Sequence, residues 1–267
     1  MEWFDSLGNK ELLVLGTAAA MFLVCLYQLW QYHRAEWKYA AKNRLKNAAF
    51  LFVLSLLAVG SVFLIPGQPV IAGLETLPVY ESEPYAVINH DEPFFTDEEK
   101  DRDVFEHYGE LDYLGRCTAA EAMLGPELLP QSEREDISEI KPSGWQSVRY
   151  EDLIEDAFLY HRCHLIAYGL SGQNANAGNL ITGTQYMNME GMRPIEGMVA
   201  SYIHRTGNHV LYRVTPYFEG SDLVARGVLI EAVSIEDDGD GIMLNRFCFN
   251  VQPGIRISYS DGSSRRE

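Results

Sequence analysis

Two long uncharged runs near the N-terminus constrain this chain more than any other feature. Residues 12–30 form nineteen consecutive positions without a charged side chain, and residues 48–65 form eighteen. A helix needs roughly 20 apolar residues to cross the ~30 Å hydrocarbon core of a bilayer. We therefore predict a two-helix transmembrane hairpin within residues 1–66, with spans at 12–30 and 48–65.

A cleaved signal peptide is the alternative for the first run. The small residues Ala18, Ala19 and Ala20 are of the kind that a signal peptidase accepts. However, the basic residues follow this run, whereas a signal peptide carries them before its apolar region, and a second apolar run comes afterwards. Both observations favour the hairpin.

The connector between the two runs predicts their orientation. It carries five basic residues and only one acidic residue, Glu36, and the basic ones are Arg34, Lys38, Lys42, Arg44 and Lys46. Positively charged connectors stay in the cytoplasm. The prediction is a multi-pass protein of the cell membrane whose C-terminal part is extracellular.

Charge is distributed unevenly along the chain. The first 65 residues hold four of the 38 acidic and six of the 21 basic residues, which leaves a net charge of −19 on the remainder. Such a surface repels nucleic acids at long range. Only residues 161–218 are not acidic, with two acidic and four basic side chains, so a polyanion site is expected there.

Four cysteines are too few for a disulfide framework. Cys25 lies in the first apolar run, which leaves Cys117, Cys163 and Cys248 in the outer part. These three permit one disulfide and one free thiol, and the sequence does not choose the pair.

The second half of the chain gives the clearest pattern of secondary structure. After a linker at 67–83, we expect a folded domain at 84–267, with strands near 85–88, 147–150 and 157–168 and a capping box at 96–99. Pro194 opens a helix that Gly207 ends. Three β-rich runs follow at 209–218, 223–235 and 241–251. This order predicts the α+β class with an antiparallel sheet.

Polar residues with a regular spacing precede and enter that helix. The segment His161-Arg162-Cys163-His164 is followed by Asn179, by Asn188 nine residues later, and by Glu196 eight residues beyond. This pattern resembles the DNA/RNA non-specific endonucleases, most closely the membrane-anchored surface nucleases of Gram-positive bacteria. Their signature is Asp-Arg-Gly-His, then Asn, Asn and Glu at the same intervals.

The resemblance extends over roughly residues 84–260. Residues 211–216 resemble the strand that follows the metal helix of this family, and residues 250–254 resemble its C-terminal strand. It implies a ββα-metal, or His-Me finger, nuclease domain. His161 and Cys163 depart from the signature Asp and Gly, and their effect on the supporting geometry is open.

The resemblance also implies roles for individual residues. His164 would be the general base, which suits a side chain whose pKa is near neutrality. Asn188 would be the single protein ligand of Mg²⁺ (or Mn²⁺), and Glu196 would hold a metal-bound water. Asn179 would brace the metal loop, and Arg162 would bind the scissile phosphate.

Other candidate sites are weaker. Arg193 and Arg213 are candidates for contacts with flanking phosphates, although an ordinary surface or ion-paired arginine is the simpler interpretation of each. The acidic segment 237–241 resembles a calcium loop but has Cys248 where the bidentate Glu should stand, so a hairpin turn is expected.

The predicted function is metal-dependent hydrolysis of phosphodiester bonds with little sequence preference. The expected partners are extracellular DNA, with RNA left open, and the membrane; the oligomeric state is not predicted. The alternative is a catalytically inactive surface module that keeps the nuclease fold for binding or structure, and the acidic surface and His161 favour it.

Overall fold

The computed structural model describes residues 9–33, 38–64 and 76–267. The chain divides into two compact units, residues 1–69 and 70–267. Each unit is described by itself.

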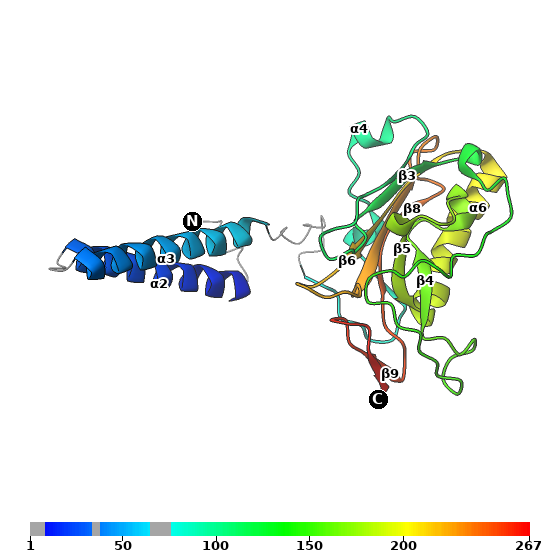
Figure 1. Cartoon of the computed structure of the whole chain (residues 1–267). Coiled ribbons are helices and arrows are strands. Elements are labelled where there is room, and N and C mark those ends of the chain that lie inside the picture. The colour runs from blue at the N-terminus through cyan, green and yellow to red at the C-terminus, as the bar shows by residue number, and fades with distance from the viewer. Residues whose placement is uncertain (1–8, 34–37, 65–75) are drawn as a thin grey trace. The chain divides into compact units, whose positions relative to one another are not determined.

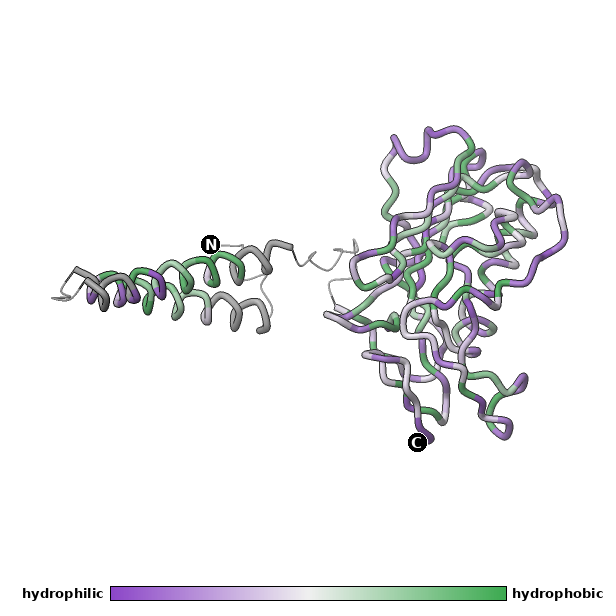
Figure 2. Tube along the Cα trace, in the orientation of Figure 1, coloured by the Kyte–Doolittle hydropathy of each residue, from purple (hydrophilic) through white to green (hydrophobic). Residues whose placement is uncertain are grey.

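The first unit contains two helices packed side by side, α2 (Asn9–His33) and α3 (Lys38–Leu64) (Figure 1). Their contact is made by small side chains: Ala18, Cys25, Ala48 and Ser55 are buried, and the Cys25 thiol lies 3.1 Å from the Ala48 carbonyl oxygen. Most of the apolar side chains described here point outward, for example Leu23 and Phe50. Hydrophobic residues predominate along the middle of the two helices, more strongly in one than in the other (Figure 2).

The prediction that these helices span a membrane is not supported. Among the residues that the structure describes, no helix is long and apolar enough to cross a bilayer. Parts of the two predicted spans, the side chains of 12–15 and 58–64 and all of residue 65, lie outside that description. The predicted orientation, with a cytoplasmic connector and an extracellular C-terminal part, depended on these spans and stays a prediction.

The second unit is built on one six-stranded antiparallel sheet. Its central strands are β6 (Val210–Tyr217), β7 (Gly227–Ser234) and β8 (Met243–Phe249), which form the predicted meander. The outer strands are β1 (Tyr85–Val87) beside β8, then β3 (Ala120–Leu124) beside β6 and β2 (Glu106–Tyr108) at the edge. The predicted α+β class with an antiparallel sheet is confirmed.

Helix α6 (Arg193–Thr206) covers one face of this sheet (Figure 1). Pro194 stands in its first turn, and Gly207 ends it with a φ of 73°, a left-handed conformation that glycine adopts without strain. The apolar stripe of the helix, which includes Ile195, Val199 and Ile203, packs against Ile230 and its neighbours. Burial of this stripe fixes the rotation of the helix, and therefore the direction of its polar residues.

The other face of the sheet is covered by the segment that leads into it. Phe95 packs against Met123 and Leu211, and Leu77 and Tyr80 pack beside Phe247. Directly after Phe95, the predicted capping box is present at the start of α4 (Asp97–Lys100). With both faces covered, every residue of β7 is buried.

A smaller sheet lies on the α6 side. It pairs β4 (Tyr160–His164) with β5 (Leu180–Thr184). Short elements complete the unit: η1 (Asn89–Asp91), η2 (Pro126–Leu128), α5 (Tyr168–Ser171), η3 (Ala177–Asn179), η4 (Met187–Met192), β9 (Ile255–Ile257) and β10 (Ser264–Arg266).

Two sequence predictions in this region differ from the structure. The expected strand at 147–150 is reduced to one bridge between Arg149 and Phe158, because the chain turns at 151–156. The strand expected at 157–168 ends at His164, where the Asn179 side chain takes both hydrogen bonds of the Ile166 backbone. The cysteines that the structure describes are all buried free thiols, so no disulfide forms among them.

Candidate active site

A cleft of about 920 Å³ lies where strand β4, the η4 turn and the start of α6 meet the loop around residues 134–147. Its lining includes His161, Arg162, His164, Asn188 and Glu196. The structure therefore brings together most of the site residues predicted from the sequence, although they come from three separate elements.

His164 is the last residue of β4 and is buried, with 7 % of its surface exposed. Its Nε2 lies 2.9 Å from the Asn174 carbonyl oxygen. A carbonyl only accepts hydrogen bonds, so in the neutral ring Nε2 carries the proton and Nδ1 has a free lone pair. Burial lowers the pKa of His164, and Arg134 adds to this effect, while the bond to Asn174 opposes it. A buried neutral imidazole with one free lone pair is suited to accept a proton.

Asn179 stabilises the chain directly after His164. Its side-chain oxygen accepts from the Ile166 amide at 2.8 Å, and its Nδ2 donates to the Ile166 carbonyl at 3.0 Å. The side chain is fully buried, where water cannot form hydrogen bonds. The backbone amide and carbonyl of Ile166 therefore depend on Asn179 for their partners. Asn179 does not line the cleft; it connects the segment before β5 to the end of β4.

Asn188 lies in η4, a π-helical turn between β5 and α6. Such turns are rare and occur mostly at functional sites. Its Nδ2 lies 3.0 Å from Nδ1 of His161 and 3.7 Å from the Met189 sulfur. Among the described contacts, its Oδ1 has no hydrogen-bond partner, so the oxygen is available to a ligand.

Two residues that the sequence analysis did not select hold this turn in place. The buried Asn250 accepts from the Thr184 amide and donates to the carbonyls of Thr182 and Ala225. Gln252 accepts from the Tyr186 amide at 3.0 Å. Residues 250–254 had been noticed only as resembling a strand of the family, and their amide side chains were the available signal.

Glu196 lies one turn into α6 and is half-buried in the cleft wall. No hydrogen bond to its carboxylate is found among the described residues. Burial raises its pKa to about 7, and Arg193 and Arg134 offset only part of this effect. A carboxylate in this position would be stabilised by a bound cation.

Arg162 is fixed by backbone carbonyls. Its Nε donates to Ile140 at 2.5 Å and one terminal nitrogen donates to Ser138 at 2.6 Å, while the guanidinium stacks on Trp145. The other terminal nitrogen, Nη1, has no partner among the described residues. Arg162 therefore fastens the 138–140 loop to β4 and keeps one nitrogen for a further acceptor.

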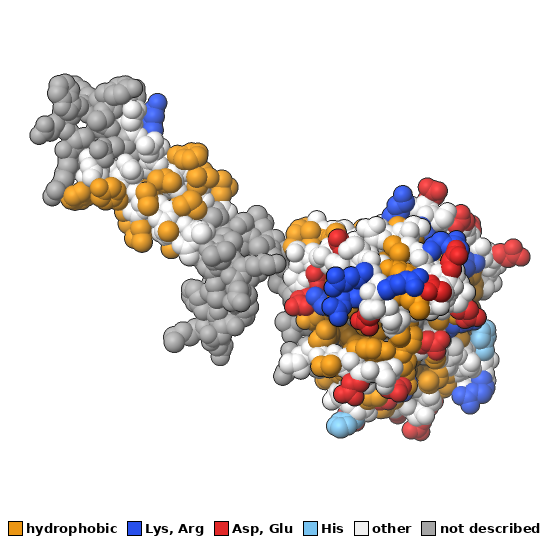
Figure 3. All heavy atoms as spheres, turned by 90° about the horizontal axis from the view of Figure 1, so that it is seen from below, with side chains coloured by type: hydrophobic (Ala, Val, Ile, Leu, Met, Phe, Trp, Pro, Cys, Tyr) orange, Lys and Arg blue, Asp and Glu red, His pale blue; other side chains and the backbone are white. Residues whose placement is uncertain are grey.

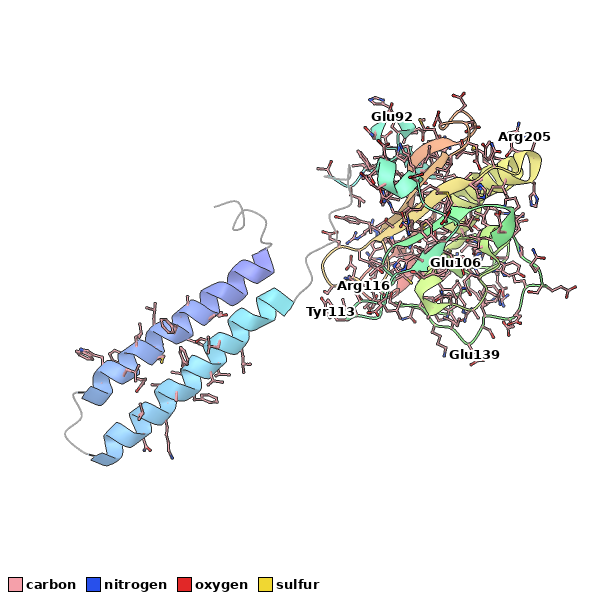
Figure 4. The ribbon with its side chains drawn as sticks, turned by 90° about the horizontal axis from the view of Figure 1, so that it is seen from above. Glu92, Glu106, Tyr113, Arg116, Glu139 and Arg205 are labelled. Atoms are coloured by element: carbon pink, nitrogen blue, oxygen red, sulfur yellow. The ribbon has the colours of Figure 1, made fainter. Side chains whose placement is uncertain are left out.

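Four basic side chains line the cleft: Arg134, Lys141, Arg162 and Arg193. Among the residues that the structure describes, Glu196 is the only acidic one in its lining. Elsewhere on the domain acidic side chains are mixed with basic ones, as the face in Figure 3 shows. Glu139 belongs to the cleft loop but does not line the cleft, and it lies at the edge of the domain in Figure 4. The cleft is thus a cationic site on an acidic domain. Sequence analysis missed Arg134 and Lys141 because it expected a polyanion site within residues 161–218, and both lie before that stretch.

Arg213 does not belong to this cleft. It lies on the sheet face opposite α6, where it pairs with Glu231 at 2.8 Å and Glu99 at 2.9 Å and stacks on Phe95. These ion pairs favour the interpretation of Arg213 as an ordinary ion-paired arginine. The predicted phosphate contact has no support in this position. Arg193, by contrast, is exposed beside Asn188 and lines the cleft.

The donor set fits a hard divalent cation held by few protein atoms. Among the described residues, no three His, Cys, Asp or Glu side chains form a metal-binding group. What the cleft offers is one open amide oxygen, on Asn188, and the carboxylate of Glu196. Mg²⁺ keeps most of its waters and binds through one or two protein oxygens, so this sparse set suits it.

The sequence profile of the DNA/RNA non-specific endonuclease family matches residues 97–235, which is more than half of the chain. The chain belongs to this family. The match includes β4, η4 and the start of α6, and hence every predicted site residue. The resemblance drawn from the polar spacing is confirmed.

Known relatives agree with this assignment. A deoxyribonuclease from Streptococcus dysgalactiae subsp. equisimilis is 34 % identical over 113 residues, which cover 40 % of this chain and 33 % of that protein. The matched segment thus spans about a third of the relative's length.

Two solved nuclease structures share the fold. NucA from Streptococcus agalactiae, with a magnesium ion bound, superposes with a TM-score of 0.63 at 22 % identity, covering 73 % of this chain and 94 % of that one. The Sda1 nuclease with a bound zinc ion gives 0.58 at 25 % identity, covering 69 % and 97 %.

The departure at Cys163 is accommodated by the neighbouring strand. A side chain at Gly183 would place its Cβ 2.3 Å from the Cys163 sulfur, so the glycine leaves room for the larger residue. Cys163 is fully buried, and its side chain lies away from the cleft lining.

Proposed function

We propose that this chain is a metal-dependent endonuclease that hydrolyses phosphodiester bonds of DNA with little sequence preference. One observation carries the proposal: a single cationic cleft contains a neutral imidazole with a free lone pair, on His164, and an open amide oxygen, on Asn188. Family membership and the deoxyribonuclease relative support the same activity.

The substrate class follows from the charge of the cleft. Its four basic side chains can contact successive phosphates, and contacts to the phosphate backbone carry no sequence information. Recognition would therefore rest on the backbone. DNA is the proposed substrate, and RNA shares the same phosphate chemistry.

The residues have distinct roles in this proposal. Arg162 directs its free Nη1 to the phosphate under attack, where a fixed guanidinium stabilises developing charge. His164 accepts the proton of the attacking water at Nδ1, because Nε2 is occupied by Asn174. Asn179 keeps the end of β4 in register with the metal loop, so that His164 stays in position.

Asn188 and Glu196 would hold the cation. When bound, Mg²⁺ or Mn²⁺ would polarise the phosphate and stabilise the leaving 3′ oxygen. Asn188 would supply a direct oxygen ligand without adding charge, and Glu196 would support the ion from further out through a water. The family resemblance implies products that carry 5′-phosphates.

The test is cleavage of plasmid DNA by the purified full-length chain. We expect degradation with Mg²⁺, none with chelator, and none by His164→Ala in either condition. A chain that binds DNA but does not cleave it with any divalent cation would instead support the alternative of an inactive binding module.

A further inference from the structure

The departure from the family signature at His161 creates a chain of contacts that ends at the proposed metal ligand. His161 stands where the signature has Asp, on β4 three residues before His164. Its Nε2 lies 2.8 Å from the Asp156 carboxylate, and its Nδ1 lies 3.0 Å from Nδ2 of Asn188. The ring therefore connects a carboxylate in the turn before β4 to an amide in η4.

Hydrogen-bond chemistry fixes the direction of both contacts. The Asp156 carboxylate only accepts, so it selects the tautomer in which His161 carries its proton on Nε2. Nδ1 then has a lone pair that can accept one N–H of Asn188. The other oxygen of Asp156 accepts from the Phe158 amide at 3.1 Å, which holds the carboxylate in place although it is half exposed.

These hydrogen bonds determine the orientation of the Asn188 amide. One N–H of its Nδ2 donates to His161 and the other is within reach of the Met189 sulfur. Rotating the amide by 180° would place Oδ1 against the His161 lone pair, which is unfavourable. The arrangement therefore leaves Oδ1, and not Nδ2, as the free atom.

We propose that His161, held in one tautomer by Asp156, is a positioning residue that orients the Asn188 amide for metal binding. This inference rests on the proposed function, since it assumes that Asn188 binds the metal. His161 stands at the position of the signature Asp, and the carboxylate of Asp156 lies one imidazole ring away from Asn188.

Side-chain geometry provides a matched pair of variants. The Nδ1 atom of histidine and the Oδ1 atom of asparagine are the same number of bonds from the backbone, so His161→Asn keeps an acceptor facing Asn188 and removes the need for Asp156. His161→Ala removes the acceptor. Asp156→Asn keeps the bond from Phe158 and turns an amide N–H toward Nε2, which favours the wrong tautomer.

The experiment measures Mn²⁺ affinity of the full-length chain from the free-ion signal in electron paramagnetic resonance, without substrate. We expect His161→Ala to bind Mn²⁺ about 10- to 100-fold more weakly, the usual effect of removing a residue that orients a metal ligand. Asp156→Asn should weaken binding less, and His161→Asn should restore near-wild-type affinity. Saturating Mn²⁺ should restore most of the cleavage rate of His161→Ala.

A double-mutant comparison separates positioning from a general structural effect. Asp156→Asn should reduce affinity in the wild-type background and have no effect in His161→Asn. As a matched control, Asp152→Asn removes a carboxylate that pairs with Arg266 outside the cleft and should change nothing. An equal effect of Asp156→Asn in both backgrounds would overturn the proposal, as would wild-type affinity in His161→Ala.

Failure of the proposed function gives a different result. If the wild-type chain does not bind Mn²⁺, or if Asn188→Ala binds it as tightly as wild type, then the metal assignment itself is wrong. If Asn188→Ala weakens binding and His161→Ala does not, the metal assignment stands and only the positioning role fails.

Discussion

Glu196→Gln tests the electrostatics of the site without substrate. Burial raises the pKa of Glu196 from 4.5 in the unfolded chain to about 7 in the fold, against the partial compensation by Arg193 and Arg134. The folded protein therefore holds a proton at Glu196 that the unfolded chain has released. Glutamine cannot ionise, so the variant should lack this contribution to pH dependence.

The sign and size of the pH dependence of stability follow from the linkage between proton binding and folding. Between pH 4.5 and 7 the folded state binds more protons at this site than the unfolded state, so stability falls as pH rises through this window. A shift from 4.5 to about 7 corresponds to roughly 3 kcal/mol at 1.36 kcal/mol per pH unit, an upper bound for a partly exposed carboxylate. For a domain of this size, that is roughly 6 to 12 °C in Tm.

The assay is thermal or urea unfolding of the metal-free protein between pH 4 and pH 8. The difference in stability between Glu196→Gln and wild type should grow in favour of the variant from pH 4.5 to 7 and then stay constant. Taking this difference removes the contributions of His164 and His209, which titrate in both proteins. Glu155→Gln, an exposed site, is the control.

A bound divalent cation should offset the loss of stability that the ionised Glu196 causes at high pH. Mg²⁺ stabilises the ionised carboxylate, so it should raise the Tm of wild type more at pH 8 than at pH 5, and this pH dependence should be smaller in Glu196→Gln. A stability difference that stays flat across pH 4.5 to 7 would show that Glu196 is already ionised and compensated in the metal-free fold, and the reasoning would be refuted.

Four further predictions concern the cleft. His164→Ala should abolish plasmid cleavage with Mn²⁺ affinity nearly unchanged, whereas Asn188→Ala should weaken both; retained activity in the first variant would exclude His164 as the base. Because burial lowers the pKa of His164, the cleavage rate at saturating metal should rise with pH through a midpoint below 6.5 and then level off. Asn179→Ala should cost roughly 2 to 4 kcal/mol in urea unfolding, since it leaves two buried backbone groups unpaired. Cleavage should change little, or rise and then fall, as salt increases from a low level; a steep monotonic loss would contradict it.

The polar spacing selected residues that lie together in one cleft, whereas the predicted strands were only partly confirmed. Asn188 and Glu196 lie eight residues apart, and the π-helical turn followed by α6 places both in one cleft. Helix α6 itself was readable because Pro194, its apolar stripe and Gly207 act locally. The strand expected at 147–150 is reduced to one bridge because the chain turns directly after it, at 151–156.

Residues that depend on long-range contacts could not be assigned from the sequence. Asn250 and Gln252 hold the η4 turn from more than sixty residues away. Arg213 and Arg193 look alike as isolated arginines, yet Arg213 lies among carboxylates on the far face of the sheet and Arg193 lines the cleft with Asn188. Only the fold distinguishes them, since alternation along β6 and rotation of α6 decide which face each side chain takes.

The acidic composition argues against an enzyme that acts on nucleic acids, but the charges are not evenly distributed over the folded domain. The net charge of −19 beyond residue 65 coexists with a cleft whose lining holds four basic side chains and one acid. Exposed charges further away than the Debye length, about 8 Å at physiological ionic strength, act weakly on a phosphate inside the cleft, whereas Arg162 and its neighbours act at contact distance. Acidic surroundings then limit non-specific adhesion of DNA to the outside of the domain and leave the cleft as the favourable place for a phosphate. Two of these cations, Arg134 and Lys141, lie in the acidic part of the chain that precedes residue 161. The average charge of a segment is therefore a poor guide to the charge of the site that it helps to form.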